Sequence, residues 1–471
     1  MDILAIALSL FLLCFVFFFF TPRKSCFGYE GAKIPPGPPR LPLLGNILQI
    51  GEKPHRSLAD LSRIYGSVMS IKLGCLTTVV ISSPEAAKEV LKTHDHVLCY
   101  RISTDPVRAA GHHARSFVWL PPFARWRFLR KITTNQLFST RSLEASKDLR
   151  MSKVQELMSF VDKCSERSEA VNIARASFVT SLNIISNALF STNLASFDDS
   201  KTTHDFHNLV IEARLWMNKL FRVFQNFIDT KRSPDACINS NNDLLDYLLD
   251  IAQENESELD DDGIKHLLLD LFLAGTDTSS SAVEWAMAEL LRNPKMIVKA
   301  QEEIRQVIGE NNTVQELVIY KLPYLQAVVK ETLRLHPSAP FLIPRKSESH
   351  NVQIFDDYSS CCVLKQIWAI GRDPSVWENP TQFEPERFLG REVDVKGNDF
   401  ELIPFEAGRR IFPGLPLGLR IVHLLLASLL YGFDWKYQNG VLPENVDMSE
   451  AFGVTLNRAD PLCALPIRMR V

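Results

Sequence analysis

The chain has 471 residues, of which 46% are hydrophobic, and its 26 prolines suit a large globular protein with many loops rather than a fibrous one. Its 52 Lys and Arg residues nearly balance 55 Asp and Glu residues, so the net charge is -3, and no basic tract long enough for nucleic-acid binding is present. The nine cysteines lack the paired spacing of a zinc site or a disulfide framework, so we expect a reducing compartment.

The first feature along the chain is an apolar run over residues 3–20, interrupted only by Ser9. Its length is about what a helix needs to cross a membrane. A cleaved signal peptide is the alternative, but Asp2 precedes the run, no small-residue cleavage site follows it, and Arg23 and Lys24 come directly after it. We therefore predict a membrane anchor over residues 1–22, with the rest of the chain in the cytosol.

Residues 23–40 are polar and rich in proline, with the sequence Pro-Pro-Gly-Pro-Pro at 35–39. Proline favours stiff, extended backbone, so this stretch predicts a hinge between the anchor and a single domain over residues 41–471. A docking motif for proline-binding domains is the alternative. Residues 71–82 are β-branched and apolar, as in a small sheet, whereas most of the later chain has helical spacing. The expected fold is mainly α with small β-sheets.

One long helix is predicted from Ile264 onwards, because apolar residues recur at helical spacing until Asn293 and Pro294 end the pattern. Its length, on the order of 45 Å, would bury its middle. That middle is the sequence Ala-Gly-Thr-Asp-Thr-Ser at 274–279, whose glycine and hydroxyl residues weaken a helix. A functional reason would be a groove beside a cofactor, where Asp277 and Thr278 supply protons to a bound oxygen species. A tolerated bend is the alternative.

Glu331 and Arg334 lie one helical turn apart. Taken singly they are an ordinary ion pair. Arg387, in the sequence Pro-Glu-Arg-Phe about fifty residues later, could join them in a network, since a guanidinium group donates in a plane to several oxygens.

These elements are followed by Phe-Glu-Ala-Gly-Arg-Arg-Ile-Phe-Pro-Gly at 405–414 and an apolar helix from Leu417. In this order they resemble the cytochrome P450 family over nearly the whole chain. Residues 368–374 and 431–435 are similar to plant members, especially the group with geraniol-type monoterpenol hydroxylases. The resemblance implies a cytochrome P450 fold behind the transmembrane helix, with haem b as cofactor. It also implies hydroxylation of small apolar molecules with O2, electrons from NADPH-cytochrome P450 reductase, and location in the endoplasmic reticulum membrane.

Carried over position by position, the resemblance implies roles for several residues. Around the haem propionates it implies Trp126, Arg130, Arg345 and Arg410. It further implies proton delivery by Asp277 and Thr278, and a structural ion network of Glu331, Arg334 and Arg387. A basic cluster of Arg125, Arg127, Arg130 and Lys131 suits an acidic reductase, although a solvated helix face explains it equally well.

The chain departs from the family pattern Phe-x-x-Gly-x-Arg-x-Cys-x-Gly at the iron ligand itself. It matches at Phe405, Gly408, Arg410 and Gly414, but Phe412 occupies the cysteine position. The thiolate of the family favours O–O cleavage, and a phenyl ring has no lone pair to replace it, so no metal ligand is predicted. Glu406 also stands where the plant pattern has glycine, and its carboxylate would need a partner.

No other residue is expected to replace the missing ligand. Cys361 and Cys362 lie in a segment remote from the loop, and His423 lies two to three turns into the following helix. Residues 211–222 and 355–368 also look shorter than the corresponding pocket-lining segments of plant members.

We therefore expect an inactive member of the family, in which haem binding is in doubt, from a decayed gene copy or a faulty gene model. Three alternatives stay open. The chain is an active monooxygenase if Phe412 is a sequence error, a non-enzymatic protein that binds haem or an apolar ligand, or an untranslated relic.

Overall fold

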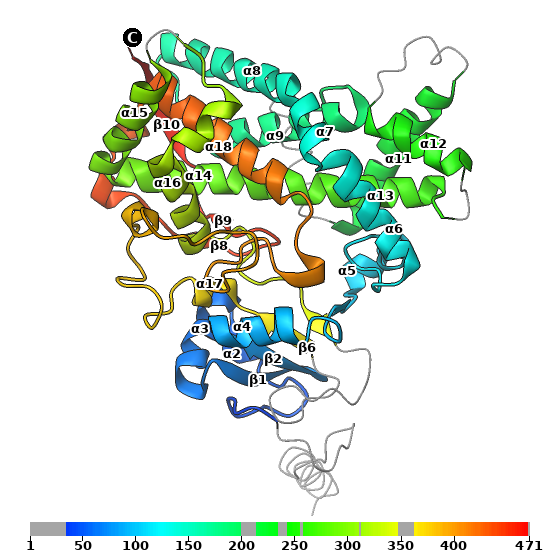
Figure 1. Ribbon diagram of the computed structural model, residues 1–471. Coiled ribbons are helices and arrows are strands. Elements are labelled where there is room, and N and C mark those ends of the chain that lie inside the picture. The colour runs from blue at the N-terminus through cyan, green and yellow to red at the C-terminus, as the bar shows by residue number, and fades with distance from the viewer. Residues whose placement is uncertain are drawn as a thin grey trace, which may run out of the picture.

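The computed structural model describes residues 34–198, 213–233, 243–254, 258–309, 312–346 and 362–469. The predicted membrane anchor, most of the hinge and Cys361 lie outside the described residues, as do residues 211–212 and 355–361 of the two segments predicted to be shortened. Figure 1 shows a large helical part, crossed by α13 and α14, with a five-stranded sheet at one end. The predicted mainly α fold with small sheets is confirmed.

The helices fall into two classes. The α-helices are α2 (Ile47–Ile50), α3 (Pro54–Tyr65), α4 (Pro84–Lys88), α5 (Asp105–Arg108), α6 (Ala124–Ile132), α7 (Thr140–Ala145), α8 (Lys147–Glu166), α9 (Ile173–Phe190), α11 (Ala213–Arg232), α12 (Leu244–Glu254), α13 (Asp261–Gly275), α14 (Asp277–Arg292), α15 (Pro294–Ile308), α16 (Pro323–Leu335), α17 (Ile367–Ile370) and α18 (Leu415–Gly432). The short 3₁₀ and π turns are η1 (Glu89–Thr93), η2 (Ala109–Ala114), η3 (Thr133–Leu137), η5 (Glu316–Lys321), η6 (Pro385–Phe388), η7 (Gly408–Arg410), η8 (Gln438–Gly440) and η9 (Pro443–Asn445).

Within the described residues, three small sheets accompany the helices. The largest has the order β1-β2-β6-β5-β3, with β1 (Val68–Leu73), β2 (Leu76–Ile81), β6 (Cys362–Lys365), β5 (Arg345–Lys346) and β3 (Tyr100–Arg101). The second has the order β4-β10-β7, with β4 (Val171–Asn172), β10 (Cys463–Arg468) and β7 (Phe433–Tyr437), and the third pairs β8 (Glu450–Ala451) with β9 (Asn457–Arg458). The apolar stretch predicted as sheet forms the antiparallel hairpin β1–β2.

The end of the proline-rich segment is attached to β1. Ser70 donates its backbone N–H to the carbonyl of Pro36 at 2.8 Å and its hydroxyl to the carbonyl of Pro35 at 2.7 Å. Any Cβ at Gly37 would lie 1.9 Å from the Ser70 carbonyl oxygen, so only glycine allows this approach. The described part of the hinge is thus fixed against the sheet.

The prediction of one continuous helix from Ile264 to Arg292 is wrong in one respect. The structure has two helices there, because α13 ends at Gly275 and α14 begins at Asp277. Between them Thr276 has φ -91° and ψ -67°, and its hydroxyl donates to the Phe272 carbonyl at 2.9 Å. Glycine and hydroxyl side chains that compete for carbonyls explain the interruption. The two helices still follow one another across the molecule (Figure 1).

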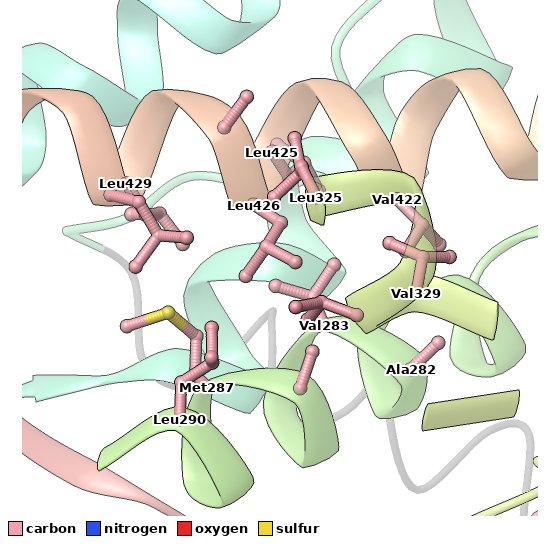
Figure 2. Close-up of a cluster of buried hydrophobic side chains, with 14 of the residues drawn as sticks. Ala282, Val283, Met287, Leu290, Leu325, Val329, Val422, Leu425, Leu426 and Leu429 are labelled. Carbon is pink, nitrogen blue, oxygen red and sulfur yellow. The ribbon is translucent and has the colours of Figure 1, made fainter. Parts of the chain in front are cut away.

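The main hydrophobic core lies where α14, α16 and α18 meet (Figure 2). The side chains that fill it include Val283 and Met287 of α14, Leu325 and Val329 of α16, and Leu426 of α18. Among the described helices, α9 and α18 are long and apolar enough to cross a membrane, but both are mostly buried inside the protein. They are therefore core helices.

Candidate functional site

A cavity of about 290 Å³ lies between α6, α9, the α13–α14 junction and the loop 405–414. Its volume is near the lower end of the range for small-molecule sites, roughly 300–1,000 Å³. Most of its wall is apolar, and this part includes Phe117, Ile185, Leu189, Leu271, Leu342 and Val422. The polar groups on its wall include Arg101, Trp126, Arg130, Asp270, Thr278, Glu406 and Arg410.

Phe412 is part of the cavity wall. Its backbone N–H donates to the carbonyl of Phe405 at 2.9 Å, and the two rings are nearly parallel at 12°, with centroids 6.3 Å apart. The Phe412 ring also covers Gly414, where a Cβ would lie 2.8 Å from two of its carbons. The loop therefore packs around the phenyl ring of Phe412.

The loop is held against the sheet end by Gly408 and Arg409. Gly408 has φ +68°, and a Cβ there would lie 2.3 Å from the Leu91 carbonyl oxygen. The Arg409 backbone N–H donates to the carboxylate of Asp95 at 2.9 Å. Only glycine combines this conformation with such an approach, so the match to the family pattern at Gly408 has a structural cause.

Glu406 is buried and its carboxylate binds three cations of the sheet. Arg101 donates to its Oε2 at 2.7 Å and Arg345 to its Oε1 at 2.8 Å, while the Lys365 Nζ lies 3.7 Å from Oε1. Although burial opposes ionisation, the charges of Arg101, Arg345 and Lys365 hold the Glu406 pKa well below its usual value. The partner that this carboxylate needs is therefore present.

The backbone of Glu406 adopts φ +65°, a left-handed conformation that is unfavourable for a residue with a Cβ. Such a conformation costs on the order of 1 kcal/mol and persists only where surrounding contacts fix it. The ion pairs of the side chain are contacts of this kind.

Of the residues implied for propionate binding, Arg410 is engaged elsewhere. Its guanidinium donates to the carbonyl oxygens of Cys99 at 2.8 Å and Leu120 at 2.6 Å, and lies 4.8 Å from the Trp126 ring centroid. Burial, then the nearby charge of Arg101, lowers the Arg410 pKa to about 9. Arg410 thus ties the loop to the segment before α6.

Trp126 and Arg130 come from one face of α6 and line the cavity. Among the described residues, the guanidinium group of Arg130 has no hydrogen-bond or ion-pair partner, although its backbone carbonyl accepts from the Thr133 hydroxyl at 3.0 Å. Burial lowers its pKa, and the charge of Glu406 opposes this effect. Arg345 lies apart from this pair, since Asp95 and Glu406 bind it. The four residues implied for propionates therefore divide into two cavity-facing donors and two that bind other groups.

Thr278 reaches the cavity wall, whereas Asp277 is buried and is not part of that wall. The Thr278 hydroxyl donates to the carbonyl of Ala274 at 2.7 Å. The glycine of this motif has a packing role, because a Cβ at Gly275 would lie 2.4 Å from Cδ1 of Ile185 in α9. The structure therefore supports a local helix interruption at the cavity and brings one of the two residues to it.

Glu331, Arg334 and Arg387 are brought together. Arg334 donates to both oxygens of Glu331 at 2.6 and 2.7 Å, and Arg387 donates to the same carboxylate at 3.0 Å. Arg334 also donates to the backbone carbonyls of Gly371, Pro380 and Gln382. These bonds join α16 to the segment that leads to η6.

The basic cluster divides between the two sides of α6. Arg127 and Lys131 are exposed, Arg130 faces the cavity, and Arg125 lies 3.7 Å from Asp260. The exposure of Arg127 and Lys131 is expected both for a solvated helix face and for a surface that docks an acidic reductase.

Neither described candidate for a replacement ligand lies on the cavity wall. Cys362 is buried in β6, and His423 in α18 bonds through Nδ1 to the Leu419 carbonyl at 2.6 Å. Burial lowers the His423 pKa to about 4. The described residues contain no group of three or more His, Cys, Asp or Glu side chains placed to hold a metal.

Three functional candidates were missed from sequence. Nothing in the sequence around Arg101 indicates that its side chain is buried and paired. Asp270 lies within the predicted helix, and the helical pattern does not show that its carboxylate accepts a hydrogen bond from the Ser116 hydroxyl at 2.7 Å. Lys365 did carry a signal, since it is a charge within the apolar strand Cys362–Lys365. A buried lysine in a strand requires a counter-ion, which here is Glu406.

The comparison with known proteins decides the family. The sequence profile of the cytochrome P450 family matches residues 35–232 and 212–462. The chain belongs to the cytochrome P450 family. The family consists of haem enzymes with monooxygenase activity, and the resemblance seen in the sequence is confirmed.

Several relatives are similar along nearly the whole chain. Cytochrome P450 76C3 of Arabidopsis thaliana is 56% identical over 474 residues, covering 92% of this chain and 91% of the relative. Cytochrome P450 76C4 of the same plant is 53% identical over 508 residues, covering 99% of both. Drimenol monooxygenase of Persicaria hydropiper is 44% identical and covers 92% of both chains. The plant-type assignment is thus confirmed, and plant cytochrome P450 proteins of this type are typically membrane-bound.

The length of one alignment bears on the segments that look shortened. The alignment with cytochrome P450 76C4 extends over 508 positions, which exceeds the 471 residues of this chain by 37. Cytochrome P450 76C4 therefore has at least 37 residues for which this chain has no counterpart in the alignment.

Proposed function

We propose that this protein keeps the cytochrome P450 fold but does not catalyse monooxygenation. The observation that carries the proposal is Phe412, whose ring lies on the cavity wall at the position of the iron ligand. A phenyl ring offers no lone pair to iron, and the electron donation that favours O–O cleavage is therefore missing. None of the described residues on the cavity wall offers a thiol or imidazole instead.

The residues of the site do not fit a haem-thiolate complex. The proximal ligand is replaced, and two of the arginines at the sheet end, Arg101 and Arg345, are bound by Glu406. Of the four residues implied for the propionates, Trp126 and Arg130 lie on the cavity wall with side-chain donors that no described group accepts from. We therefore derive no reaction step through haem in this chain.

We propose residues 1–22 as a single-pass anchor in the endoplasmic reticulum membrane, residues 23–40 as the hinge, and residues 41–471 as a cytosolic domain. Plant relatives and the apolar run of residues 3–20 support this arrangement. NADPH-cytochrome P450 reductase would be a partner of a functional ancestor. In this chain Asp277, Thr278, Glu331, Arg334 and Arg387 would then act mainly in holding the fold.

A second function is the binding of a small apolar molecule without oxygen chemistry. The observation that favours it is the cavity of about 290 Å³, whose wall is largely apolar despite the altered loop. Ligands that bind the folded state stabilise it in proportion to their occupancy. A monoterpenol such as geraniol should therefore raise the melting temperature of the purified chain in a concentration-dependent way.

The test of lost catalysis is a carbon monoxide difference spectrum of the reduced protein. The full chain, Phe412→Cys and Phe412→Leu are purified in parallel from the same host. We expect no thiolate-type band from the natural chain or from Phe412→Leu, which removes the ring without adding a sulfur ligand. A thiolate-type band from the natural chain would contradict the proposal. Resequencing codon 412 tests whether the gene encodes cysteine there.

A further inference from the structure

The carboxylate of Glu406 lies inside a cluster of cations from three neighbouring strands. Arg101 comes from β3, Arg345 from β5 and Lys365 from β6, and their side chains are 3%, 0% and 0% exposed. Arg101 makes a two-pronged contact, with Nη1 at 3.3 Å from Oε1 and Nη2 at 2.7 Å from Oε2. The cluster and Glu406 both border the cavity, since Arg101 and Glu406 are part of its wall.

The balance of charge in this cluster depends on Glu406. The only other carboxylate bonded to these cations in the described chain is Asp95, which accepts from Arg345 at 2.6 Å. The cluster thus holds three basic side chains, Arg101, Arg345 and Lys365, and two carboxylates, and burial lowers the pKa of Lys365 well below its usual value. Without Glu406, Arg101 would have no ion-pair partner among the described residues, and a buried unpaired cation strongly favours an incoming anion.

The backbone shows that this carboxylate is held in place. Glu406 keeps φ +65° although its Cβ disfavours that conformation. Its neighbour Ala407 is fully buried and accepts from Arg345 through its carbonyl at 3.0 Å. Arg345 therefore donates to the loop through Nε and Nη2, while its Nη1 donates to Asp95.

We propose that Glu406 is a built-in substitute for a ligand carboxylate, so that the cavity accepts neutral apolar molecules and rejects those that carry a carboxylate beside Arg101. The inference rests on the proposed ligand-binding function and names its ligand class. A carboxylate beside Arg101 would meet the negative charge of Glu406, which already binds the guanidinium groups of Arg101 and Arg345. Trp126 and Arg130 remain as donors for a neutral oxygen, such as a hydroxyl group.

The test compares geraniol with geranic acid, which share one carbon skeleton and differ in an alcohol or an ionised carboxylate at neutral pH. Dissociation constants are measured by calorimetry on the full chain in detergent. We expect the natural chain to bind geraniol at least tenfold more tightly than geranic acid. Glu406→Gln, which keeps the side-chain shape, should bind geranic acid at least tenfold more tightly than the natural chain does, with little change for geraniol.

Glu316→Gln is the matched control, because Glu316 is also a buried carboxylate that binds two arginines, Arg150 at 2.7 and 2.6 Å and Arg420 at 3.1 Å, but lies outside the cavity wall. It should leave the preference for the alcohol unchanged. Equal affinity of the natural chain for both probes, or an unchanged preference in Glu406→Gln, would overturn the inference. If the natural chain binds neither probe, the ligand-binding function fails, and acid binding by Glu406→Gln still decides the role of Glu406.

Haem content gives a second readout that separates the two proposals. Phe412→Cys and the double variant Phe412→Cys/Glu406→Gly are expressed with excess haem, and bound haem per chain is measured after gel filtration. We expect the double variant to retain at least fivefold more haem, since it frees Arg101 and Arg345 for the cofactor carboxylates. Equal retention would sink the inference about Glu406 while leaving the proposal on Phe412 intact.

Discussion

Arg101 and Arg345 are directly opposed partners in the antiparallel pair β3–β5, so the strand register places two buried guanidinium groups side by side. Like charges in this relationship destabilise a sheet. The carboxylate of Glu406, from a loop sixty residues further along the chain, accepts from both. The altered loop therefore supplies the counter-ion for the edge of the largest sheet.

Replacing Arg345 with methionine should lower the free energy of unfolding by about 3–5 kcal/mol. The reason is that Asp95 and Glu406 would both lose a partner inside the protein. Urea denaturation followed by circular dichroism measures the change. Arg409→Met is the control, because that side chain is 56% exposed and lies 3.7 Å from Asp95. It should cost less than about 1 kcal/mol, and equal losses would contradict the role given to burial.

Glu331→Gln should also destabilise the protein strongly, by about 3–5 kcal/mol, because Arg334 and Arg387 share this buried carboxylate. The comparison is Glu386→Gln, which breaks the pair between Glu386 and Lys299, both about half exposed. That loss should stay below about 1 kcal/mol. Thermal unfolding of both variants under the same conditions tests the difference. A small effect at Glu331 would show that the network adds little to stability.

Gly275→Ala should destabilise the protein by about 1–3 kcal/mol, although alanine favours a helix more than glycine does. The new Cβ would lie 2.4 Å from Cδ1 of Ile185, so α9 and α13 would have to move apart. Urea denaturation of the natural chain and of the Gly275→Ala variant measures this change in the free energy of unfolding.

The cause can be isolated with Ile185→Val, which removes the Cδ1 atom. In this background Gly275→Ala should lose most of its cost, because the helix preference of alanine remains while the contact is gone. A cost that is the same in both backgrounds would show that packing against Ile185 is not the reason for the glycine.

Much of the architecture could be predicted because it depends on local pattern. The β1–β2 hairpin follows from β-branched residues around Gly74, and the weak point at 274–279 follows from glycine and hydroxyl residues. The pattern did not show that the helix would divide at Thr276. Apolar spacing continues on both sides of that residue, and periodicity is insensitive to one change of backbone angle.

The partners of Glu406 could not be predicted in the same way. Arg101 and Arg345 are 244 positions apart, and only the pairing of β3 with β5 brings them together. Strand partners so far apart in sequence are set by the tertiary fold, which a single sequence does not specify. The sequence did show that a carboxylate at 406 would need a partner.

The last prediction concerns the two histidines behind the cavity wall. His112 and His266 bond through their Nδ1 atoms at 2.7 Å, so one ring must donate and the other accept. Burial, then the charges of His112 and Arg115, lowers the His266 pKa to about 4. His112 also contacts Asp270 at 3.1 Å, and Asp270 lies on the cavity wall.

Because the folded-state pKa of His266 is below the ordinary value near 6.5, the folded protein binds fewer protons than the unfolded chain between pH 6.5 and 4. The stabilisation is complete above pH 6.5 and is lost as the pH falls through this window, by on the order of 3 kcal/mol. His266→Gln should therefore flatten the decline of the free energy of unfolding over this range, whatever its effect at pH 7. His96→Gln, at an exposed position, should keep the natural slope. If both variants retain that slope, protonation of His266 does not limit stability in acid.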